Sequence, residues 1–260
     1  MTKYYYLGTY LPSLSFDMPL EIKWNELETL LRDNLTEKDY QKVDLIRGLY
    51  DLLNLRAYWL KEELDPFGNL DPNELEEALL NNQAELPVYV SDFLEKYNTK
   101  EERLHHFPFL LSTFFKQAAE SSKGFLRDYL SFERELRLVM TGFRAKRLGR
   151  DLSIELQYEN PEEELIAQIL AQKDAKEYEP PEKYQELKGI FKTYADDPLG
   201  LQRAIDEYRF NFINQLVNLS DQFSIESILA YTTQFMILQK WFQLDKQKGN
   251  EIVDIIVKEV

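Results

Sequence analysis

The chain of 260 residues contains no cysteine. This absence excludes a disulfide framework, a thiolate metal site and a cysteine nucleophile. Glycine and proline are also scarce, with 9 and 10 residues respectively. Few turn-forming residues favour long helices over many short strands joined by tight turns. The sequence therefore predicts an all-α protein.

Long apolar runs are also missing. The densest one, Phe107–Phe115, spans nine residues and includes proline, serine and threonine, whereas about twenty apolar residues are needed to cross a bilayer. The first sixteen residues are apolar and aromatic, but Gly8 and Pro12 interrupt them, unlike the hydrophobic region of a secretory signal. We therefore expect a cytoplasmic protein that reaches a membrane only as a peripheral part of a complex.

Basic residues are the minority among the charged ones. Lys and Arg number 31 against 46 Asp and Glu, so the formal net charge is −15. A surface of this sign repels phosphate backbones and anionic lipids, so we expect no nucleic-acid partner. The acidity favours a basic or neutral protein partner, or serves solubility alone.

Apolar residues are plentiful despite the charge. They make up 44% of the chain, with 16 Phe, 16 Tyr and 3 Trp, which is enough for a buried core. We expect a single helical unit over residues 1–260. A short extended segment over Tyr4–Pro12 is the predicted exception, because aromatic residues there favour extended structure.

Several short patterns predict where helices begin. Each places Ser, Thr, Asp or Asn at the cap position, often followed by Pro or by an acidic residue that can complete a capping box. The predicted starts are Thr36 (with a helix to about Leu64), Asp71, Thr99, Asn160, Asp197 and Ser224.

The segment 174–186 differs from the rest of the chain. It contains Pro180 and Pro181 and lies within residues 155–186, where ten acidic residues stand against three Lys. Such composition predicts a linker or an exposed hairpin.

Three segments share a weak repeat, over residues 36–85, 120–172 and 224–260. Leu55, Arg56 and Gly68 recur 81 residues later as Leu136, Arg137 and Gly149. The third copy is looser, with Gln239 and then Gly249. Each copy predicts a long helix, a glycine-containing turn and a second helix, and such pairs pack against their neighbours.

These segments resemble the helical repeat unit of the C subunit of the V/A-type ATPases, whose eukaryotic counterpart is the d subunit. The best match runs from Tyr129 through Glu133 and Glu135-Leu136-Arg137 to Arg144–Gly149, and the next from Asn54-Leu55-Arg56 through Gly68 to Glu74 and Leu75. The opening, Tyr4-Tyr5-Tyr6-Leu7 to Leu11–Ser15, is similar to an uncharacterised bacterial family that is encoded among V-type ATPase subunits.

The resemblance implies three related helical lobes that form a socket. In the ATPase family the socket seats the central shaft on the membrane rotor ring, transmits torque and performs no chemistry. The resemblance implies the shaft subunits and the ring as partners, and it leaves open whether the ion is a proton or sodium. A stand-alone helical adaptor and an enzyme of unrecognised type are the alternatives.

Candidate chemistry is sparse, and we predict no catalytic, cofactor-binding or metal-binding residue. His105 and His106 are the only histidines, and neighbours on a helix point about 100° apart, which is unsuited to one shared metal. Asp65–Asp71 superficially resembles a calcium loop, but Phe67 occupies a ligand position and Gly68 comes too early. We interpret the first as a helix-surface pair and the second as a turn between helices.

Arg127–Arg150 is a basic island in this acidic chain. It holds seven cations against three acidic residues, Asp128, Glu133 and Glu135. Glu133 and Arg137 are four residues apart and can pair on one helix face. The island predicts internal pairing between packed helices, docking of an acidic partner, or RNA binding. We further expect Arg56 and Arg137 to bury their stems and pair with carboxylates.

Overall fold

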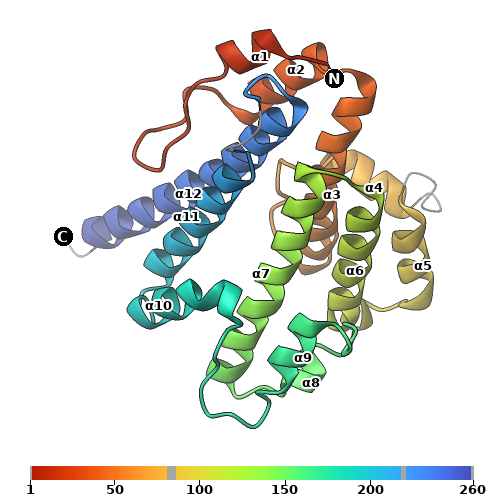
Figure 1. Cartoon of the computed structure of the whole chain (residues 1–260), viewed down its shortest axis with the longest axis vertical. Helices are drawn as coiled ribbons and strands as arrows, with labels where there is room; N and C mark the ends of the chain where they lie inside the picture. Colours follow the sequence, from red (N-terminus) through yellow and green to blue (C-terminus); the bar gives the residue numbers. More distant parts are fainter. Residues whose placement is uncertain (1, 81–85, 218–220, 259–260) are drawn as a thin grey trace. The chain divides into compact units, whose positions relative to one another are not determined.

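The computed structural model describes residues 2–80, 86–217 and 221–258, with side chains up to Leu244 in the last helix. In those ranges the backbone forms twelve α-helices, one 3₁₀ helix and no strand, which confirms the predicted all-α class (Figure 1). The chain divides into two compact units, one made of residues 37–181 and the other of residues 1–36 and 182–260. Of the two boundaries between the units, the one after residue 181 falls inside the predicted linker, 174–186, and the other follows Thr36.

The unit of residues 37–181 is built on three long helices. Helix α6 packs against both α3 and α7, α5 packs against α6, and α8 and α9 pack against α7. Trp59, near the end of α3, is buried, with its ring centroid 6.2 Å from that of Phe93 and 6.3 Å from that of Phe107. The helices are α3 (Glu37–Leu60), α4 (Pro72–Leu80), α5 (Val88–Lys96), α6 (Lys100–Ser121), α7 (Phe125–Leu148), α8 (Leu152–Glu155) and α9 (Glu164–Leu170).

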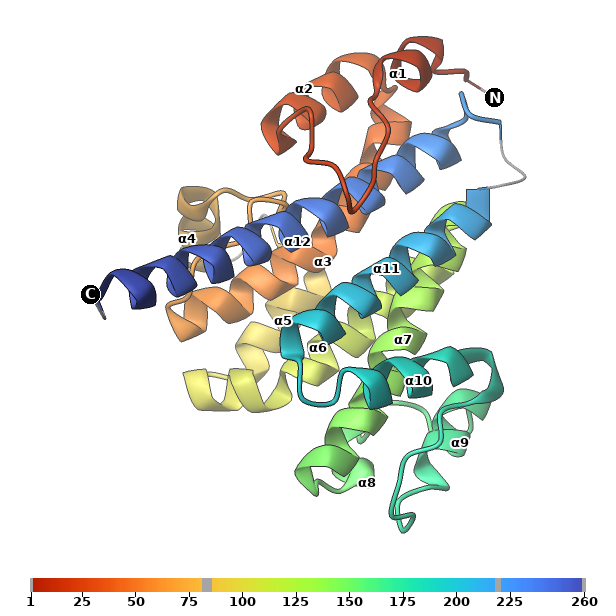
Figure 2. The same cartoon turned by 90° about the vertical axis from the view of Figure 1, so that its left-hand side faces the viewer.

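The other unit is built on a helical hairpin. Helices α11 and α12 pack along each other, and they run side by side in both views (Figures 1 and 2). Trp24 of α2 lies 6.4 Å from Phe235 of α12, which ties the start of the chain to its end. The elements are α1 (Tyr5–Tyr10), α2 (Trp24–Asn34), η1 (Glu182–Tyr184), α10 (Gln185–Thr193), α11 (Pro198–Val217) and α12 (Ile225–Lys258).

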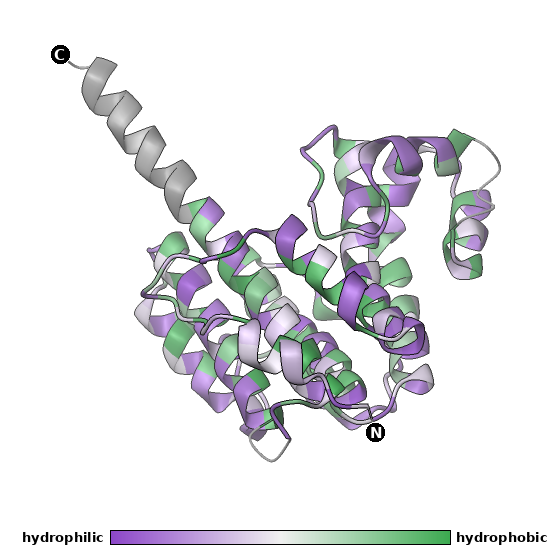
Figure 3. Cartoon of the chain, turned by 90° about the horizontal axis from the view of Figure 1, so that it is seen from above, coloured by the Kyte–Doolittle hydropathy of each residue, from purple (hydrophilic) through white to green (hydrophobic). Residues whose placement is uncertain are grey.

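Most helices carry both apolar and polar residues along their length, as the hydropathy colouring shows (Figure 3). An amphipathic helix buries its apolar stripe against neighbours and leaves its polar face in water. In α7 the buried stripe includes Tyr129, Leu136 and Val139, which are at most 4% exposed. None of the described helices is both long and apolar enough to cross a membrane.

Five of the six predicted helix starts are correct. Asp71 Oδ1 accepts hydrogen bonds from the backbone N–H of Asn73 (2.8 Å) and Glu74 (2.9 Å), and Glu74 accepts from the N–H of Asp71 (2.8 Å). Thr99 and Glu102 form the same reciprocal box at the start of α6. Helices α3, α11 and α12 also begin where predicted, although α3 ends at Leu60, four residues before the predicted end.

The predicted start at Asn160 is wrong by about one turn, since α9 begins at Glu164. Asn160 Oδ1 accepts from the N–H of Glu162 at 3.0 Å, which makes a turn rather than the first turn of a helix. The neighbouring Glu159 and Glu163 both bind Arg134 of α7, and these ion pairs hold the segment out of the helix.

The predicted extended segment at the start of the chain is helical over Tyr5–Tyr10, and extended backbone begins only at Leu11. Tertiary contacts override the local preference here. The N–H of Tyr4 donates to the carbonyl of Phe223 at 2.8 Å, and Leu7 is fully buried. A short helix buries Leu7 and leaves the neighbouring tyrosines exposed.

Two of the three turns predicted for the repeat segments are present in the structure, and the third is not. Helices α3 and α4, and α7 and α8, form helix–turn–helix pairs, but α12 continues through Gly249 without a turn. No proline follows Gly249 to end the helix, and one glycine inside a helix costs only about 1 kcal/mol. Residues 81–85 and 259–260 of these segments lie outside the described part, and the relation between the copies stays a prediction.

Candidate functional site

Helix α7 carries six of the seven cations of the basic island, and a glycine flanks it at each end. The helix begins after Gly124, whose φ of 58° is left-handed, and ends at Gly149, whose φ is 63°. The N–H of Arg150 donates to the carbonyl of Ala145 (2.8 Å), and that of Gly149 to the carbonyl of Lys146 (3.3 Å). This pair of bonds is a Schellman cap, which needs a left-handed residue and therefore favours glycine.

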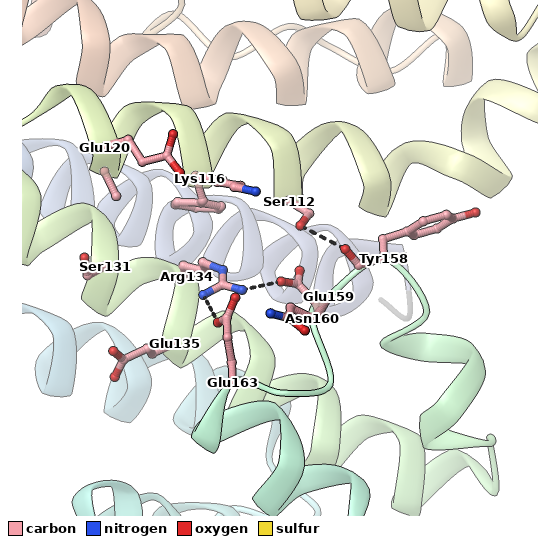
Figure 4. A pocket seen from close by; sticks show the side chains of 12 residues that line it. Ser112, Lys116, Glu120, Ser131, Arg134, Glu135, Tyr158, Glu159, Asn160 and Glu163 are labelled. Atoms are coloured by element: carbon pink, nitrogen blue, oxygen red, sulfur yellow. Dashed lines mark hydrogen bonds and ion pairs between the residues drawn. The ribbon is translucent and has the colours of Figure 1, made fainter.

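A polar cleft of about 360 Å³ opens between α6, α7 and the connection from α8 to α9 (Figure 4). It is of ordinary size for a ligand pocket, but such pockets are mostly apolar. Here the lining is mainly charged and polar. Its polar members are Ser112, Lys116, Glu120, Ser131, Arg134, Glu135, Tyr158, Glu159, Asn160 and Glu163.

Glu159 is the central side chain of this cleft. One carboxylate oxygen accepts from Arg134 at 2.6 Å and the other from Arg137 at 2.8 Å. The Glu159 side chain is 4% exposed, against 20% and 25% for the two arginines. Arg134 also donates to Glu163 at 2.7 Å. One turn of α7 is therefore fixed to the α8–α9 connection by three charge-assisted hydrogen bonds.

The same connection is fastened to α6. Ser112 donates its hydroxyl to the carbonyl of Tyr158 at 3.3 Å, and His106 Nδ1 hydrogen-bonds the Tyr158 hydroxyl. His106 also stacks on Tyr97, with ring centroids 4.1 Å apart. His106 is thus part of an aromatic cluster that joins helices, whereas His105 is exposed.

The surroundings shift the pKa values of Arg137 and Arg134 in opposite directions. Burial lowers the pKa of Arg137, and Glu159 opposes that shift. Burial also acts to lower the pKa of Arg134, but the hydrogen bonds that Arg134 donates to Glu163 and Glu159 outweigh it and raise the pKa overall. Guanidinium pKa values lie far above neutrality, so both side chains stay charged. They act as fixed counter-ions for Glu159.

Both carboxylate oxygens of Glu159 are thus occupied by guanidinium groups, one from Arg134 and one from Arg137. Among the described residues, no group of three or more His, Asp or Glu side chains is placed to hold a metal ion.

A second polar cluster organises the turn between α3 and α4. Arg47 is 5% exposed, and its guanidinium donates to the carbonyls of Phe67 (3.1 Å) and Gly68. Asp51 accepts from the N–H of Asn69 at 2.6 Å, and Asn54 exchanges two hydrogen bonds with the backbone of Asp65. Residues 65–71 therefore form a turn held by the side chains of α3, as the sequence indicated.

Arg56 does not play the buried role that its spacing predicted. Its side chain is 48% exposed and lies 4.0 Å from Glu62. The reason is helical phase: the apolar stripe of α3 passes through Leu55, which is 1% exposed, and the next residue points away. Arg47 occupies the buried position instead. The prediction for Arg137 is confirmed, with Glu159 as its partner.

The basic island divides into paired and unpaired members. Besides Arg134 and Arg137, Lys146 donates to the carbonyls of Lys173 (2.6 Å) and Ala175 (2.7 Å), and Arg150 pairs with Glu155 at 3.4 Å. Internal pairing is therefore confirmed for these four. No ion pair joins the remaining cations to described residues; they are Arg127, Arg144 and Arg147, all exposed.

Two residues of these clusters, Glu159 and Arg47, were not singled out by sequence reasoning. Glu159 is one of ten acidic residues in its stretch, and only the turn between α8 and α9 selects it. A usable signal existed for Arg47, because Arg47, Asp51 and Asn54 are polar residues at three- and four-residue spacing within an otherwise apolar stripe. Such polar residues on a buried face need partners.

The sequence profile of a family described as "Protein of unknown function (DUF2764)" matches residues 1–260. An uncharacterized protein of Chlamydia pneumoniae is 31% identical over 266 residues, covering 100% of this chain and 99% of that protein. An uncharacterized protein of Chlamydia trachomatis serovar D is 27% identical over 263 residues, covering 99% and 98%. No solved structure shows significant similarity to the chain.

Proposed function

The chain belongs to the DUF2764 family of proteins of unknown function, and we propose that it is a non-catalytic coupling subunit of a V/A-type ATPase. In this role it seats the central shaft on the membrane rotor ring and transmits torque. The resemblance of its repeat segments to the C subunit of that enzyme motivates the proposal. The observation that carries it is the ion-pair network in which Glu159 joins two arginines of α7.

A part that transmits torque must resist shear between its helices. Ion pairs that join a helix to the following connection oppose sliding, because moving one turn would leave buried charges unpaired at a cost of about 3–5 kcal/mol. The aromatic cluster around His106 fixes the same connection to α6. Charged side chains in the cleft thus stiffen the scaffold, as a coupling role requires.

An adaptor without a rotary complex is the second candidate, and exposed tyrosines favour it. Tyr5, Tyr6 and Tyr10 on α1 are 62%, 54% and 53% exposed. Tyrosine is enriched at binding hot spots because it buries a large area with few rotatable bonds. Such a surface suits a protein partner of any complex.

Reconstitution with isolated parts of the ATPase tests the first candidate. The purified protein is mixed with the shaft subunits and, separately, with the detergent-solubilised ring. We expect a stable complex on size-exclusion chromatography at moderate salt, with slower association as the salt concentration rises, because an acidic surface steers encounter. If neither the shaft nor the ring retains the protein from low to physiological salt, the rotor assignment fails and the adaptor takes its place.

A further inference from the structure

We infer that the C-terminal corner of α7 is a docking site for an acidic, partly apolar segment of a partner protein. We define the corner by Arg144, Arg147, Leu148 and Ile154. All four are exposed, and Leu148 and Ile154 each expose 60% of their surface. Neither arginine forms an ion pair within the described part of the chain. The inference rests on the proposed function, which supplies the partner: the segment belongs to the shaft subunits or to the ring.

The helical period brings the first three side chains together. Arg144, Arg147 and Leu148 are related by three and four residues, so they share one face of α7. The Schellman cap at Gly149 fixes how the chain leaves this face. Arg150 reaches over the turn to Glu155 at 3.4 Å, which anchors the short helix that carries Ile154. The corner is therefore a preformed surface on two packed elements.

A helix dipole explains only part of this corner. Cations in the last turn of a helix are stabilised by the helix dipole, which accounts for Lys146 and Arg147. It does not account for Arg144, which lies one turn earlier, or for two large aliphatic side chains left in water. The apolar contact of a Schellman cap joins the third residue before the cap to the second after it, here Ala145 and Arg150. Leu148 is therefore not needed for the cap.

Charge decides which partner fits. The chain carries a net charge of −15, so an exposed, unpaired basic corner is its local exception. Arginine binds carboxylates through two parallel hydrogen bonds. Leu148 offers an exposed apolar side chain on the same face of α7, and Ile154 offers a second one on the adjoining α8. An amphipathic segment with paired Asp or Glu side chains and one or two aliphatic or aromatic side chains matches both features. Nucleic acid and anionic membrane would meet repulsion from the rest of the surface.

Charge reversal with a matched control tests the inference. The variant Arg144→Glu/Arg147→Glu is compared with Lys123→Glu/Arg127→Glu, which changes the same charge at exposed positions near the start of the same helix. Titration uses whichever of the shaft subunits or the ring retains the unmodified protein. We expect the first variant to weaken binding about tenfold or more and the second to stay within about threefold of the unmodified protein.

A neutral pair of variants separates the apolar contribution. Leu148→Ser/Ile154→Ser should also weaken binding, whereas Val88→Ser, at a residue that is 76% exposed on α5, should not. Circular dichroism checks that each variant is folded. We expect all of them to fold, because the substituted side chains are exposed.

Three outcomes overturn the inference. In the first, the unmodified protein binds the shaft or ring and all variants bind equally well, so the proposed function stands without this corner. In the second, the charge reversal leaves complex formation intact but abolishes binding to phosphatidylserine vesicles, which assigns the corner to a membrane. In the third, the unmodified protein binds neither the shaft nor the ring, so that the proposed function and its named partner fail together.

Discussion

Glu159 forms ion pairs with two guanidinium groups at once, so its removal should be costly for a single side chain. The variant Glu159→Ala leaves Arg134 and Arg137 without their shared counter-ion in a largely buried place. Breaking a buried pair costs about 3–5 kcal/mol, and the partial exposure of the arginines places the expected loss near the lower end. Urea denaturation followed by circular dichroism measures the loss as a lower midpoint.

The matched control for this variant is Glu155→Ala. Glu155 pairs with Arg150, but the two side chains are 30% and 59% exposed, and an exposed pair is worth about 0–1 kcal/mol. Equal midpoints for the two variants would show that the Glu159 network contributes no more than a surface pair.

Asp51 gives the fold a pH dependence whose sign can be worked out. Burial raises the pKa of Asp51 above its ordinary 3.8, although hydrogen bonds from Asn69 and Leu70 oppose the shift. The folded state therefore holds the Asp51 proton more tightly than the unfolded state does. The resulting stabilisation is complete below pH 3.8 and is lost as the pH rises through the higher pKa of the folded state.

The variant Asp51→Asn removes this titration. The free energy of unfolding of the unmodified protein should fall relative to that of the variant as the pH rises above 3.8, and the difference should level off above the folded pKa. Urea unfolding at a series of pH values measures both curves. Parallel curves, or a difference that grows in the opposite direction, would contradict the assignment.

At the level of helices, two glycines should respond to alanine in opposite directions. Gly149 has a φ of 63° at the end of α7, although a Cβ there would meet no atom within 4 Å. An alanine in the left-handed region costs about 1–2 kcal/mol. Gly189 lies inside α10, also with open space and without a positive φ, so alanine there should stabilise by about 0.5–1 kcal/mol.

Thermal unfolding of Gly149→Ala and Gly189→Ala checks this contrast. The melting temperature should fall for the first variant and rise for the second. A fall of similar size for both would contradict the prediction that the left-handed backbone of Gly149 distinguishes the two positions.

Helices whose starts depend on nearby residues could be predicted from the sequence. Asp71 and Thr99 form caps with residues two or three positions away, and such signals act before tertiary packing. The helix over Tyr5–Tyr10 could not be predicted, because its position depends on Phe223, over two hundred residues along the chain. The same limit applies to the cleft, since the pairing of Glu159 with α7 depends on a turn that local signals placed wrongly.

The repeat spacing illustrates a second limit. Gly68 and Gly149 are 81 residues apart in matching motifs, but they serve different purposes. Gly149 has a left-handed backbone, whereas Gly68 is required because a Cβ there would lie 2.7 Å from Asn54 Nδ2. Arg56 and Arg137 differ in the same way, one exposed and one paired. Equal spacing therefore did not predict equal environments.

At the scale of the whole molecule, the way the two units are distributed along the chain determines which of them can fold alone. The unit of residues 37–181 is contiguous, whereas the other is assembled from residues 1–36 and 182–260. A contiguous unit with its own buried centre around Trp59 meets the usual description of an autonomous domain. The other unit needs both ends of the chain, since Trp24 packs near Phe235 and the N–H of Tyr4 donates to Phe223.

We therefore predict that a fragment of residues 37–181 folds alone. It should show a helical circular dichroism spectrum and one cooperative urea transition, because its long helix α6 packs against both α3 and α7 within the fragment. Glu159→Ala should lower the midpoint of the fragment as much as it lowers the corresponding transition of the full chain, since all its partners lie within these residues. Residues 182–260 alone lack Trp24 and Tyr4 and should unfold without a cooperative transition. The prediction would be contradicted if the fragment of residues 37–181 were unfolded or aggregated while the fragment of residues 182–260 folded alone.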